Sequence, residues 1–529
     1  MDERTNVYLP INGGFRVKRS VAKRLADRKR RIRERLRRTN RNKYQRLAEN
    51  AGCVMSSNGV KYELSDKIRG IAYGGISMFR RLAERVGLVD IIDRRLHLLR
   101  FHLPYHESDH VLNFAFNALC EGTCLQDIEL RRNDEVFLDA LGADAIPDPT
   151  TAGDFCRRFS EEDVRVLLDA INHARLNAWQ TQAEDFFSEA VIDMDGTMVI
   201  TTGECKEGMD ISYKGEWGYH PLVVSLANTG EVLSIVNRPG NRPSHEGAGE
   251  EANRAIRVCR RGGFHRIRLR GDTDFSQTEY LDGWTDEGVL FQFGYDAKPN
   301  LKAIAEDLPE TGWTKLIRPP SYQREGPARQ RPPRVKRTVI RRRQYLHLEL
   351  QSEEVAEFEY QPAACARPYR MIVVRKNISQ EKGERRLLDE VRYFFYITND
   401  RTASASEIVF GCNDRCDQEN LIAHLASGVH ALKAPVDNLV SNWAYMVMTS
   451  LAWTLKAWAA LWLPIQPRHR ARHEEERQSL LRMEFRTFVH AFVKIPCQIV
   501  LQSRRTIHRV LNWNPFLPPF FRLCEALRC

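Results

Sequence analysis

The stretch VIDMDGTMVI, residues 191–200, places two aspartates inside an otherwise apolar run. Its alternation predicts a β-strand in which Asp193, Asp195 and Thr197 share one face and the apolar side chains share the other. Such a strand is expected inside a sheet, where a buried carboxylate is costly unless a cation neutralises it. The fold of this chain must therefore bring a cation to this strand.

The residues that follow predict a mixed α/β sheet. Residues 217–227 and 230–238 keep the two-residue period, and the turn at 228–230 joins them, so the first three strands are antiparallel. The next elements are a helix capped by Ser244 and closed by Gly262 and Gly263, a strand over 265–275, a helix opened by a capping box from Ser276 to Glu279, and a strand over 289–295.

Two further acids are predicted to lie close to the first strand in the folded chain. Asp272 and Asp274 end the strand over 265–275, just before a helix. If the two strands are neighbours, one acid from each meets at the sheet surface. Two such carboxylates repel each other unless a hard divalent cation lies between them, and Mg²⁺ accepts oxygen ligands of this kind.

A third acid is expected from a helix that packs beside the first strand. The segment 411–432 offers Glu419, with Arg415 one helical turn before it on the same face. Asp414 and Asp417 are the competing candidates. Read alone, these acids are also compatible with an ordinary helix surface.

The charge of the chain favours a polyanionic partner. The net charge is +11, and residues 16–46 carry sixteen Lys and Arg against two acids. This segment is either a solvated tail or an arm that neutralises DNA phosphates. No CxxC pair occurs among the twelve cysteines, so zinc is not expected, and reduced thiols in a cytoplasm are the simple interpretation.

Helical periodicity dominates before the first strand. Within residues 66–185, two helices joined near Ser160 follow a cap at Thr150 or Thr151, and they expose Arg157 and Arg158. This pattern is compatible with a DNA-binding helix-turn-helix or with a small helical bundle. The apolar segment 438–465 contains Lys456 and is expected to be a core helix rather than a membrane span.

A β-rich segment with a basic flank is expected between 299 and 404. Its Trp313 could stack on a base, although a core position is the alternative interpretation. DNA contacts are also expected from its arginines, namely Arg334, Arg337, Arg341, Arg342 and Arg343. The resulting division of the chain is a basic, partly disordered arm (1–65), a helical N-terminal domain (66–185), the first part of the core (186–298), the β-rich insertion (299–404), the second part of the core (405–465) and a C-terminal helical region (466–529).

The motifs IDMDGT, RLRGDTDF, YFFYITND and NDRCDQENLI, in this order, resemble those of the DDE transposases of bacterial insertion sequences. The resemblance covers roughly residues 100–460 and is to the branch with a β-rich insertion between the second Asp and the Glu. It implies an RNase H-like core, with the family's acids at Asp195, Asp272 and Glu419. Departures occur at Cys412, where the family has Tyr, and downstream, where its Lys is missing.

The resemblance also implies a reaction. The three acids would hold two Mg²⁺ ions, for which Mn²⁺ substitutes, and the enzyme would cleave the element's terminal inverted repeats and join the 3′-hydroxyl to target DNA. Arg415 would hold a phosphate, and Asp193, Asp274 and Thr197 would support the ligands. Expected partners are double-stranded DNA and a second copy in a synaptic complex, in the bacterial cytoplasm at the nucleoid and without a membrane. An inactive DNA-binding derivative and a nuclease that does not join DNA are the alternatives.

Overall fold

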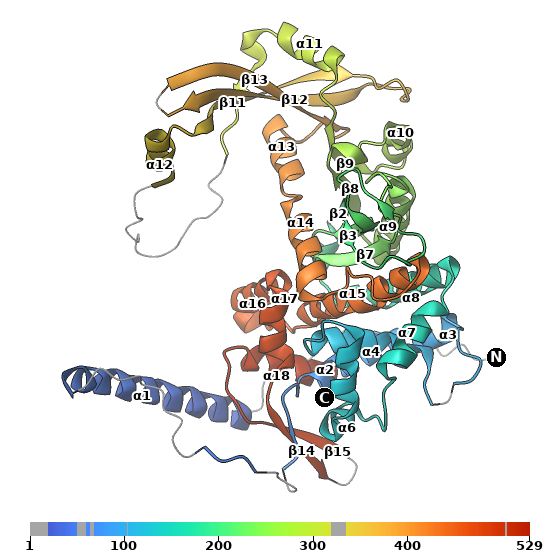
Figure 1. Cartoon of the computed structure of the whole chain (residues 1–529), viewed down its shortest axis with the longest axis vertical. Helices are drawn as coiled ribbons and strands as arrows, with labels where there is room; N and C mark the ends of the chain where they lie inside the picture. Colours follow the sequence, from blue (N-terminus) through green and yellow to red (C-terminus); the bar gives the residue numbers. More distant parts are fainter. Residues whose placement is uncertain are drawn as a thin grey trace.

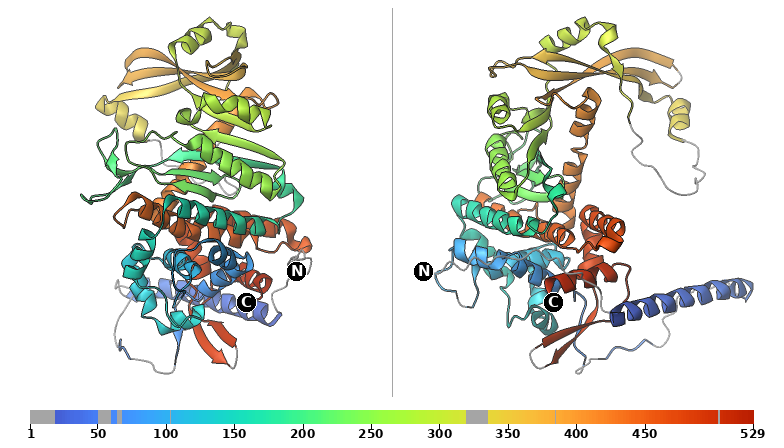
Figure 2. Two further views of the ribbon diagram at one scale, coloured as in Figure 1. Left: turned by 90° about the vertical axis from the view of Figure 1, so that its right-hand side faces the viewer. Right: turned by 180° about the vertical axis from the view of Figure 1, so that it is seen from behind.

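The computed structural model describes residues 19–49, 60–63, 68–102, 104–318, 335–383, 385–502 and 505–529 (Figure 1). A nine-stranded sheet with the order β10-β11-β12-β13-β9-β8-β2-β6-β7 runs through these residues. Helices α9 (Ala248–Gly262) and α10 (Thr278–Asp286) lie on one side of its central strands, and α13 (Ala405–Asn413) and α14 (Cys416–Ala423) lie on the other (Figures 1 and 2). The expected mixed α/β class is confirmed.

The strand with two aspartates is β2 (Glu189–Gly196). It is the central strand of the part of the sheet with the order β9-β8-β2-β6-β7. It pairs antiparallel with β6 (Leu222–Leu226), which pairs antiparallel with β7 (Glu231–Val236). On its other side β2 runs parallel to β8 (Arg266–Gly271), and β8 runs parallel to β9 (Leu290–Tyr295). The three antiparallel strands and the two later strands are thus confirmed.

The strand predicted over 217–227 is broken in the structure. Its first residues form β5 (Trp217–Tyr219), which joins β3 (Val199–Ile200) and β4 (Asp210–Ile211) in a small separate sheet. Pro221 stands between β5 and β6 and has no N–H to donate to a ladder, so the chain changes partners there.

Two predicted helix caps are wrong. Helix α9 begins after Gly247, whose φ is 72°, and not at Ser244. Helix α10 begins after Gln277, because a short 3₁₀ turn, η3 (Thr273–Phe275), takes up the residues after β8, and Ser276 donates to the carbonyl of Thr273 instead. The predicted end of α9 is confirmed, since Gly263 caps it in the left-handed region with φ 99°.

The expected β-rich segment follows β9 and extends the same sheet. It comprises α11 (Pro299–Asp307), β10 (Thr314–Lys315), α12 (Val335–Arg343), β11 (Leu346–Tyr360), β12 (Tyr369–Lys382) and β13 (Arg385–Thr398). The last residues of β13, Phe395 to Thr398, pair with β9. The antiparallel strands β11, β12 and β13 therefore extend the sheet beyond β9.

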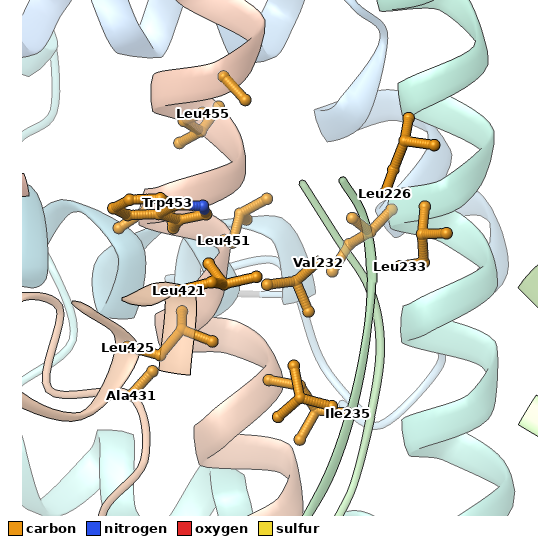
Figure 3. Packing of buried hydrophobic residues seen from close by; sticks show 14 of the residues in the cluster. Leu226, Val232, Leu233, Ile235, Leu421, Leu425, Ala431, Leu451, Trp453 and Leu455 are labelled. Carbon is orange, nitrogen blue, oxygen red and sulfur yellow. The ribbon is translucent and has the colours of Figure 1, made fainter. Parts of the chain in front are cut away.

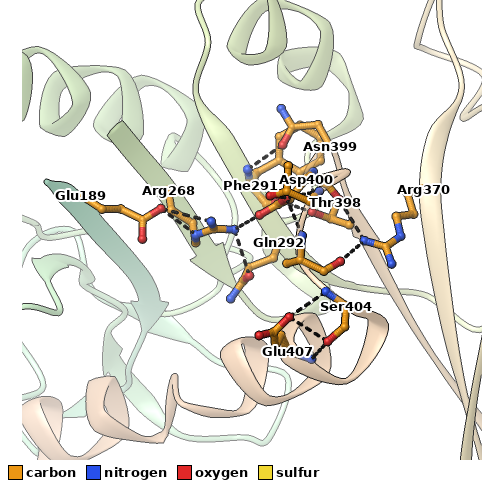
Figure 4. Close-up of polar contacts among 12 residues, drawn as sticks. Glu189, Arg268, Phe291, Gln292, Arg370, Thr398, Asn399, Asp400, Ser404 and Glu407 are labelled. Carbon is orange, nitrogen blue, oxygen red and sulfur yellow. Dashed lines mark hydrogen bonds and ion pairs between the residues drawn. The ribbon is translucent and has the colours of Figure 1, made fainter. Parts of the chain in front are cut away.

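Asp400 fixes the turn from β13 into α13. Its Oδ1 accepts hydrogen bonds from the backbone of Thr402 and Ala403 at 2.8 and 3.1 Å, and its Oδ2 accepts one from Arg268 at 2.9 Å (Figure 4). Burial alone would raise the pKa of Asp400, but these bonds hold it well below its usual value. Arg370 adds a bond to the carbonyl of Asp400, so α13 leaves the sheet at a defined point.

Helix α15 (Leu439–Leu461) joins the sheet to the helical part of the chain. It is buried along nearly its whole length and packs against β7, α4 and α8, so the predicted core helix is confirmed. Val232 and Ile235 of β7 point toward Leu421 of α14 and Leu451 of α15 (Figure 3). Among the described residues, none of the helices is long and apolar enough to cross a membrane.

The helical part combines residues that precede the nine-stranded sheet in the sequence with the C-terminal residues. Its elements are α2 (Ile76–Arg85), α3 (Leu88–Arg95), α4 (Glu107–Leu119), α5 (Ile128–Arg132), α6 (Glu135–Leu141), α7 (Pro149–Arg157), α8 (Glu161–Trp179), α16 (Arg470–Arg482), α17 (Phe485–Phe488) and α18 (Leu517–Leu527). The C-terminal region is not wholly helical, because β14 (Cys497–Gln502) and β15 (Arg505–Val510) form a hairpin that pairs with β1 (Gly70–Ile71).

Of the two interpretations of the residues around Ser160, the packing favours a helical bundle over a DNA-binding helix-turn-helix. Helices α7 and α8 do meet at Ser160, which caps α8, although Asp148 and not a threonine caps α7. Helix α8 packs against α15, α3 and α9, and Arg175 and Trp179 on it are fully buried. A helix enclosed in this way is not presented to a DNA groove.

The described residues of the basic arm include a long helix, α1 (Arg19–Glu49), whereas residues 1–18, 50–59 and 64–65 lie outside the described part. Near its start, Arg28 donates to the carbonyls of Val510 and Asn512 at 3.0 Å, and Leu25 packs against the core. Beyond this contact the helix extends away from the rest of the molecule (Figures 1 and 2). The first part of α1 is thus anchored at the C-terminal hairpin.

A buried polar cluster around Glu231 joins β7 to α8 and α15. Glu231 and Arg175 are both fully buried, and Arg175 Nε donates to Glu231 Oε1 at 3.0 Å. Trp458 donates to the same oxygen at 2.8 Å, while Trp179 and Thr229 donate to Oε2 at 3.0 and 2.7 Å. Both carboxylate oxygens are therefore satisfied by groups from three elements.

We predict that Glu231→Ala destabilises the protein by about 3–5 kcal/mol, because it leaves the buried charge of Arg175 without its carboxylate. Urea unfolding followed by tryptophan fluorescence measures this loss. The double variant Glu231→Met, Arg175→Met is the control and is expected to recover part of the stability, because it removes the unpaired charge but leaves the donors of Trp179, Trp458 and Thr229 without their acceptor. A loss of less than about 1 kcal/mol in Glu231→Ala would contradict this role.

Candidate active site

The two aspartates of β2 have different partners. The Asp193 side chain is 1% exposed, and its two oxygens accept hydrogen bonds from Nε and Nη2 of Arg270, both at 2.7 Å. Arg270 stands opposite Asp193 on the parallel strand β8 and also donates to the carbonyl of Gly411 at 3.2 Å. The cation that neutralises this buried carboxylate is therefore an arginine of the chain itself.

Asp195 lies two residues further along β2, and its side chain is partly exposed to solvent. Burial raises the pKa of Asp195 to about 6; Arg415 opposes this rise, and the nearby carboxylates of Asp272 and Glu419 add to it. Asp272 follows β8 directly and accepts a hydrogen bond from the backbone of Asp274 at 3.0 Å. Burial raises the pKa of Asp272 as well.

Arg415 lies among the three predicted acids. Its Nη1 is 3.6 Å from Asp195 Oδ2 and 3.6 Å from Asp272 Oδ2, and its Nη2 is 3.7 Å from Glu419 Oε1. The structure thus brings Asp195, Asp272 and Glu419 around one guanidinium, although they come from β2, from the end of β8 and from α14. Glu419 is the most open of the three, with 60% of its side chain exposed.

Gln418 holds α14 against the sheet. Its side chain is buried, its Nε2 donates to the carbonyl of Val223 at 3.0 Å, and the hydroxyl of Ser225 donates to its Oε1. Because Val223 is the register partner of Asp195, this contact places the next residue, Glu419, near Asp195. Sequence reasoning missed Gln418, because a glutamine among the other polar residues of this helix carries no local signal of what it contacts.

The other predicted site residues lie in varied surroundings. Thr197 is half-buried just after β2, and Asp274 is exposed. Cys412 is buried, and His424 stacks on Trp453 with ring centroids 5.1 Å apart, so these two positions face the protein interior.

The predicted DNA-contacting residues are dispersed. Arg157 and Arg158 are both exposed, and Arg157 is paired with Asp154 and Asp437. Trp313 is only 9% exposed and lies beneath Arg375, 4.3 Å from its ring centroid, so it presents no free face to a base. On and before α12, Arg341, Arg342 and Arg343 are exposed, Arg337 belongs to the helix, and Arg334 lies outside the described residues.

The donor set of Asp195, Asp272 and Glu419 suits a hard cation. In the part of the chain that the structure describes, no three His, Cys, Asp or Glu side chains are grouped closely enough to hold a metal ion. The guanidinium of Arg415 stands between the carboxylates instead. One such cation against three carboxylates leaves two negative charges unbalanced, and oxygen ligands of this type are those that Mg²⁺ prefers.

Comparison with known proteins gives a family match. The model of the family described as Transposase DDE domain group 1 matches residues 71–528. A cryo-EM structure of the piggyBac transposase synaptic complex with hairpin DNA is 11% identical and aligns over 79% of this chain and 81% of that chain, with a TM-score of 0.36. That likeness is too weak to carry an inference. No curated protein matches the sequence.

We predict opposite stability effects for the two aspartates of β2 in EDTA. Asp195→Asn should raise stability at pH 7.5 by about 1–3 kcal/mol, because a pKa raised from 3.8 to about 6 makes the ionised form unfavourable in the folded state. The gain should shrink as the pH falls from 6 to 4, where wild-type Asp195 becomes protonated. Thermal unfolding across this pH range measures it.

Burial raises the pKa of Asp193 as well. The matched variant Asp193→Asn should nevertheless lower stability by about 3–5 kcal/mol at pH 7.5, because it leaves the charge of Arg270 buried without its carboxylate. Equal effects of the two substitutions would contradict the separate roles of Asp193 and Asp195.

Proposed function

This chain belongs to the DDE transposase family, and we propose that it is the transposase of a bacterial insertion sequence. It would cleave DNA at the element's terminal inverted repeats and transfer the freed 3′-hydroxyl to target DNA. The observation that carries this proposal is the convergence of Asp195, Asp272 and Glu419 on one point from three separate elements.

The sheet order supports an RNase H-like core. The strands β9-β8-β2-β6-β7 place β2 at the centre, antiparallel to β6 and parallel to β8. We take residues 186–298 and 405–465 as the two parts of this core and 299–404 as an insertion between the second Asp and the Glu. The catalytic acids would then lie on the central strand, on its parallel neighbour and on the covering helix.

Asp195, Asp272 and Glu419 would hold two divalent cations, Mg²⁺ or in its place Mn²⁺. When bound, such ions lower the pKa of water and stabilise the leaving oxygen of a phosphodiester. Asp193 is not available for this purpose, because it is buried and both of its oxygens are paired with Arg270. Its role is to hold β2 and β8 together beneath the site.

The basic elements would bind the DNA backbone. The exposed arginines of α1 and α12 offer phosphate contacts that do not depend on sequence. Arg415 would meet the phosphate nearest the acids. Since two element ends take part in transposition, a homodimer in a synaptic complex at the nucleoid is the assembly that fits this function.

A cleavage and strand-transfer assay on DNA carrying the gene's flanking inverted repeats tests the function. In Mg²⁺ or Mn²⁺ we expect wild type to cut and join DNA. Each of Asp195→Ala, Asp272→Ala and Glu419→Ala should lower the rate of both steps by more than about 100-fold, which exceeds the loss typical of a residue that only supports a metal ligand. Asp417→Ala, an exposed acid on the same helix as Glu419, is the matched control and should keep activity.

The other outcomes identify other functions. Cutting without joining would indicate a nuclease. DNA binding that is equal in EDTA and in Mg²⁺, with no cleavage, would indicate an inactive DNA-binding derivative.

We also predict that α1 contributes salt-dependent affinity. Replacing the exposed Arg31, Arg33 and Arg37 by Gln should flatten the slope of log K against log salt by about 0.9 for each DNA phosphate that the variant no longer neutralises. Fluorescence anisotropy with a labelled duplex at several salt concentrations measures the slope. Glu34→Gln on the same helix is the control and should not weaken binding, and an unchanged slope in the triple variant would exclude α1 from the DNA interface.

A further inference from the structure

Two arginines beside β2 are held in very different ways. Arg270 has 9% of its side chain exposed and grips Asp193 through two hydrogen bonds of 2.7 Å. Arg415 has 22% exposed, and its three carboxylate contacts are 3.6, 3.6 and 3.7 Å long. Charged hydrogen bonds of this type are normally about 2.7–2.9 Å. Arg270 is therefore a fixed partner, whereas Arg415 is held by charge more than by geometry.

Arg415 is nearly equally far from all three carboxylates and is not paired with one of them in particular. A single nitrogen, Nη1, is equally far from Asp195 and Asp272, and the other nitrogen faces Glu419. The guanidinium thus lies within ion-pair distance of all three acids and reduces the repulsion among them.

We propose that Arg415 and the divalent cations are alternative occupants of the space among Asp195, Asp272 and Glu419. This rests on the proposed function, because it takes the three acids as the metal ligands. Mg²⁺ requires its oxygen ligands at about 2.0–2.1 Å in near-octahedral geometry. Carboxylates that surround a guanidinium cannot adopt this arrangement, and the positive charge of Arg415 repels an incoming ion.

The local structure allows the exchange. Arg415 lies at the junction of α13 and α14, and Glu419 one turn later is largely exposed. The long arginine side chain can swing from the acids while Gln418 keeps α14 on the sheet. A guanidinium released from the acids is free to meet a DNA phosphate, so metal binding and DNA binding would favour each other, as thermodynamic linkage requires. Without DNA, Arg415 would keep the site closed to metal.

Mn²⁺ binding to the full-length protein without DNA tests the proposal, with free Mn²⁺ measured by electron paramagnetic resonance. Arg415→Gln should bind Mn²⁺ about 5–150-fold more tightly than wild type, the range of typical coupling between two sites. Arg415→Lys keeps the charge and should remain closer to wild type. The control Arg401→Gln removes an exposed arginine that is paired with Glu359, and it should leave Mn²⁺ affinity unchanged.

The outcomes separate this inference from the proposed function. If Asp195→Asn abolishes Mn²⁺ binding but Arg415→Gln binds no more tightly than wild type, the acids are ligands and the exchange is wrong. If Asp195→Asn leaves Mn²⁺ binding unchanged, the acids are not the ligands and both proposals fail. Thermal unfolding in EDTA verifies that each variant is folded, and a larger Mn²⁺-induced rise in melting temperature for Arg415→Gln than for wild type would support the exchange independently.

Discussion

The buried ion pair between Asp193 and Arg270 sets the geometry on which the site depends. The two residues are direct register partners on the parallel strands β2 and β8. Asp195 and Asp272 each follow their member of the pair by two residues, and in a parallel ladder they therefore come to the same level and face. A shift of one residue between these strands would separate both the ion pair and the two acids. The pair thus links the stability of the central strands to the position of the candidate ligands.

Two further polar contacts complete the frame. Gln418 ties α14 to β6 beside Asp195, so Glu419 approaches from the helix side of the sheet. Glu231 ties β7 to α8 and α15, so the helical part of the chain supports the far edge of the same sheet. The candidate active site lies between these contacts. The contacts of Arg415 with the three acids are 3.6–3.7 Å long, whereas the hydrogen bonds of Arg270 and Gln418 that surround the site are 2.7–3.0 Å long. Such a difference is typical of sites that exchange ligands, because local mobility is needed where binding occurs.

The sequence was informative where a pattern is local. The alternation around Asp193 and Asp195 predicted a central strand, and the spacing of Arg415 and Glu419 predicted a shared helix face. Side-chain partners that depend on strand register or on packing could not be predicted from neighbouring residues. Examples are the pairs Asp193 with Arg270, Ser225 with Gln418 and Arg268 with Asp400. The predicted caps at Ser244 and Ser276 failed because a glycine in the left-handed region and a 3₁₀ turn precede the helices. The helix-turn-helix interpretation of α7 and α8 failed because tertiary packing encloses α8.

The most direct test of the account is to locate bound Mn²⁺ by anomalous diffraction in crystals of the protein with a DNA end. The account predicts anomalous peaks within coordination distance of carboxylate oxygens of Asp195, Asp272 and Glu419, with Arg415 moved away from them and Asp193 still paired with Arg270. Peaks bound by other residues, or Mn²⁺ on Asp193 with the Arg270 pair broken, would contradict it.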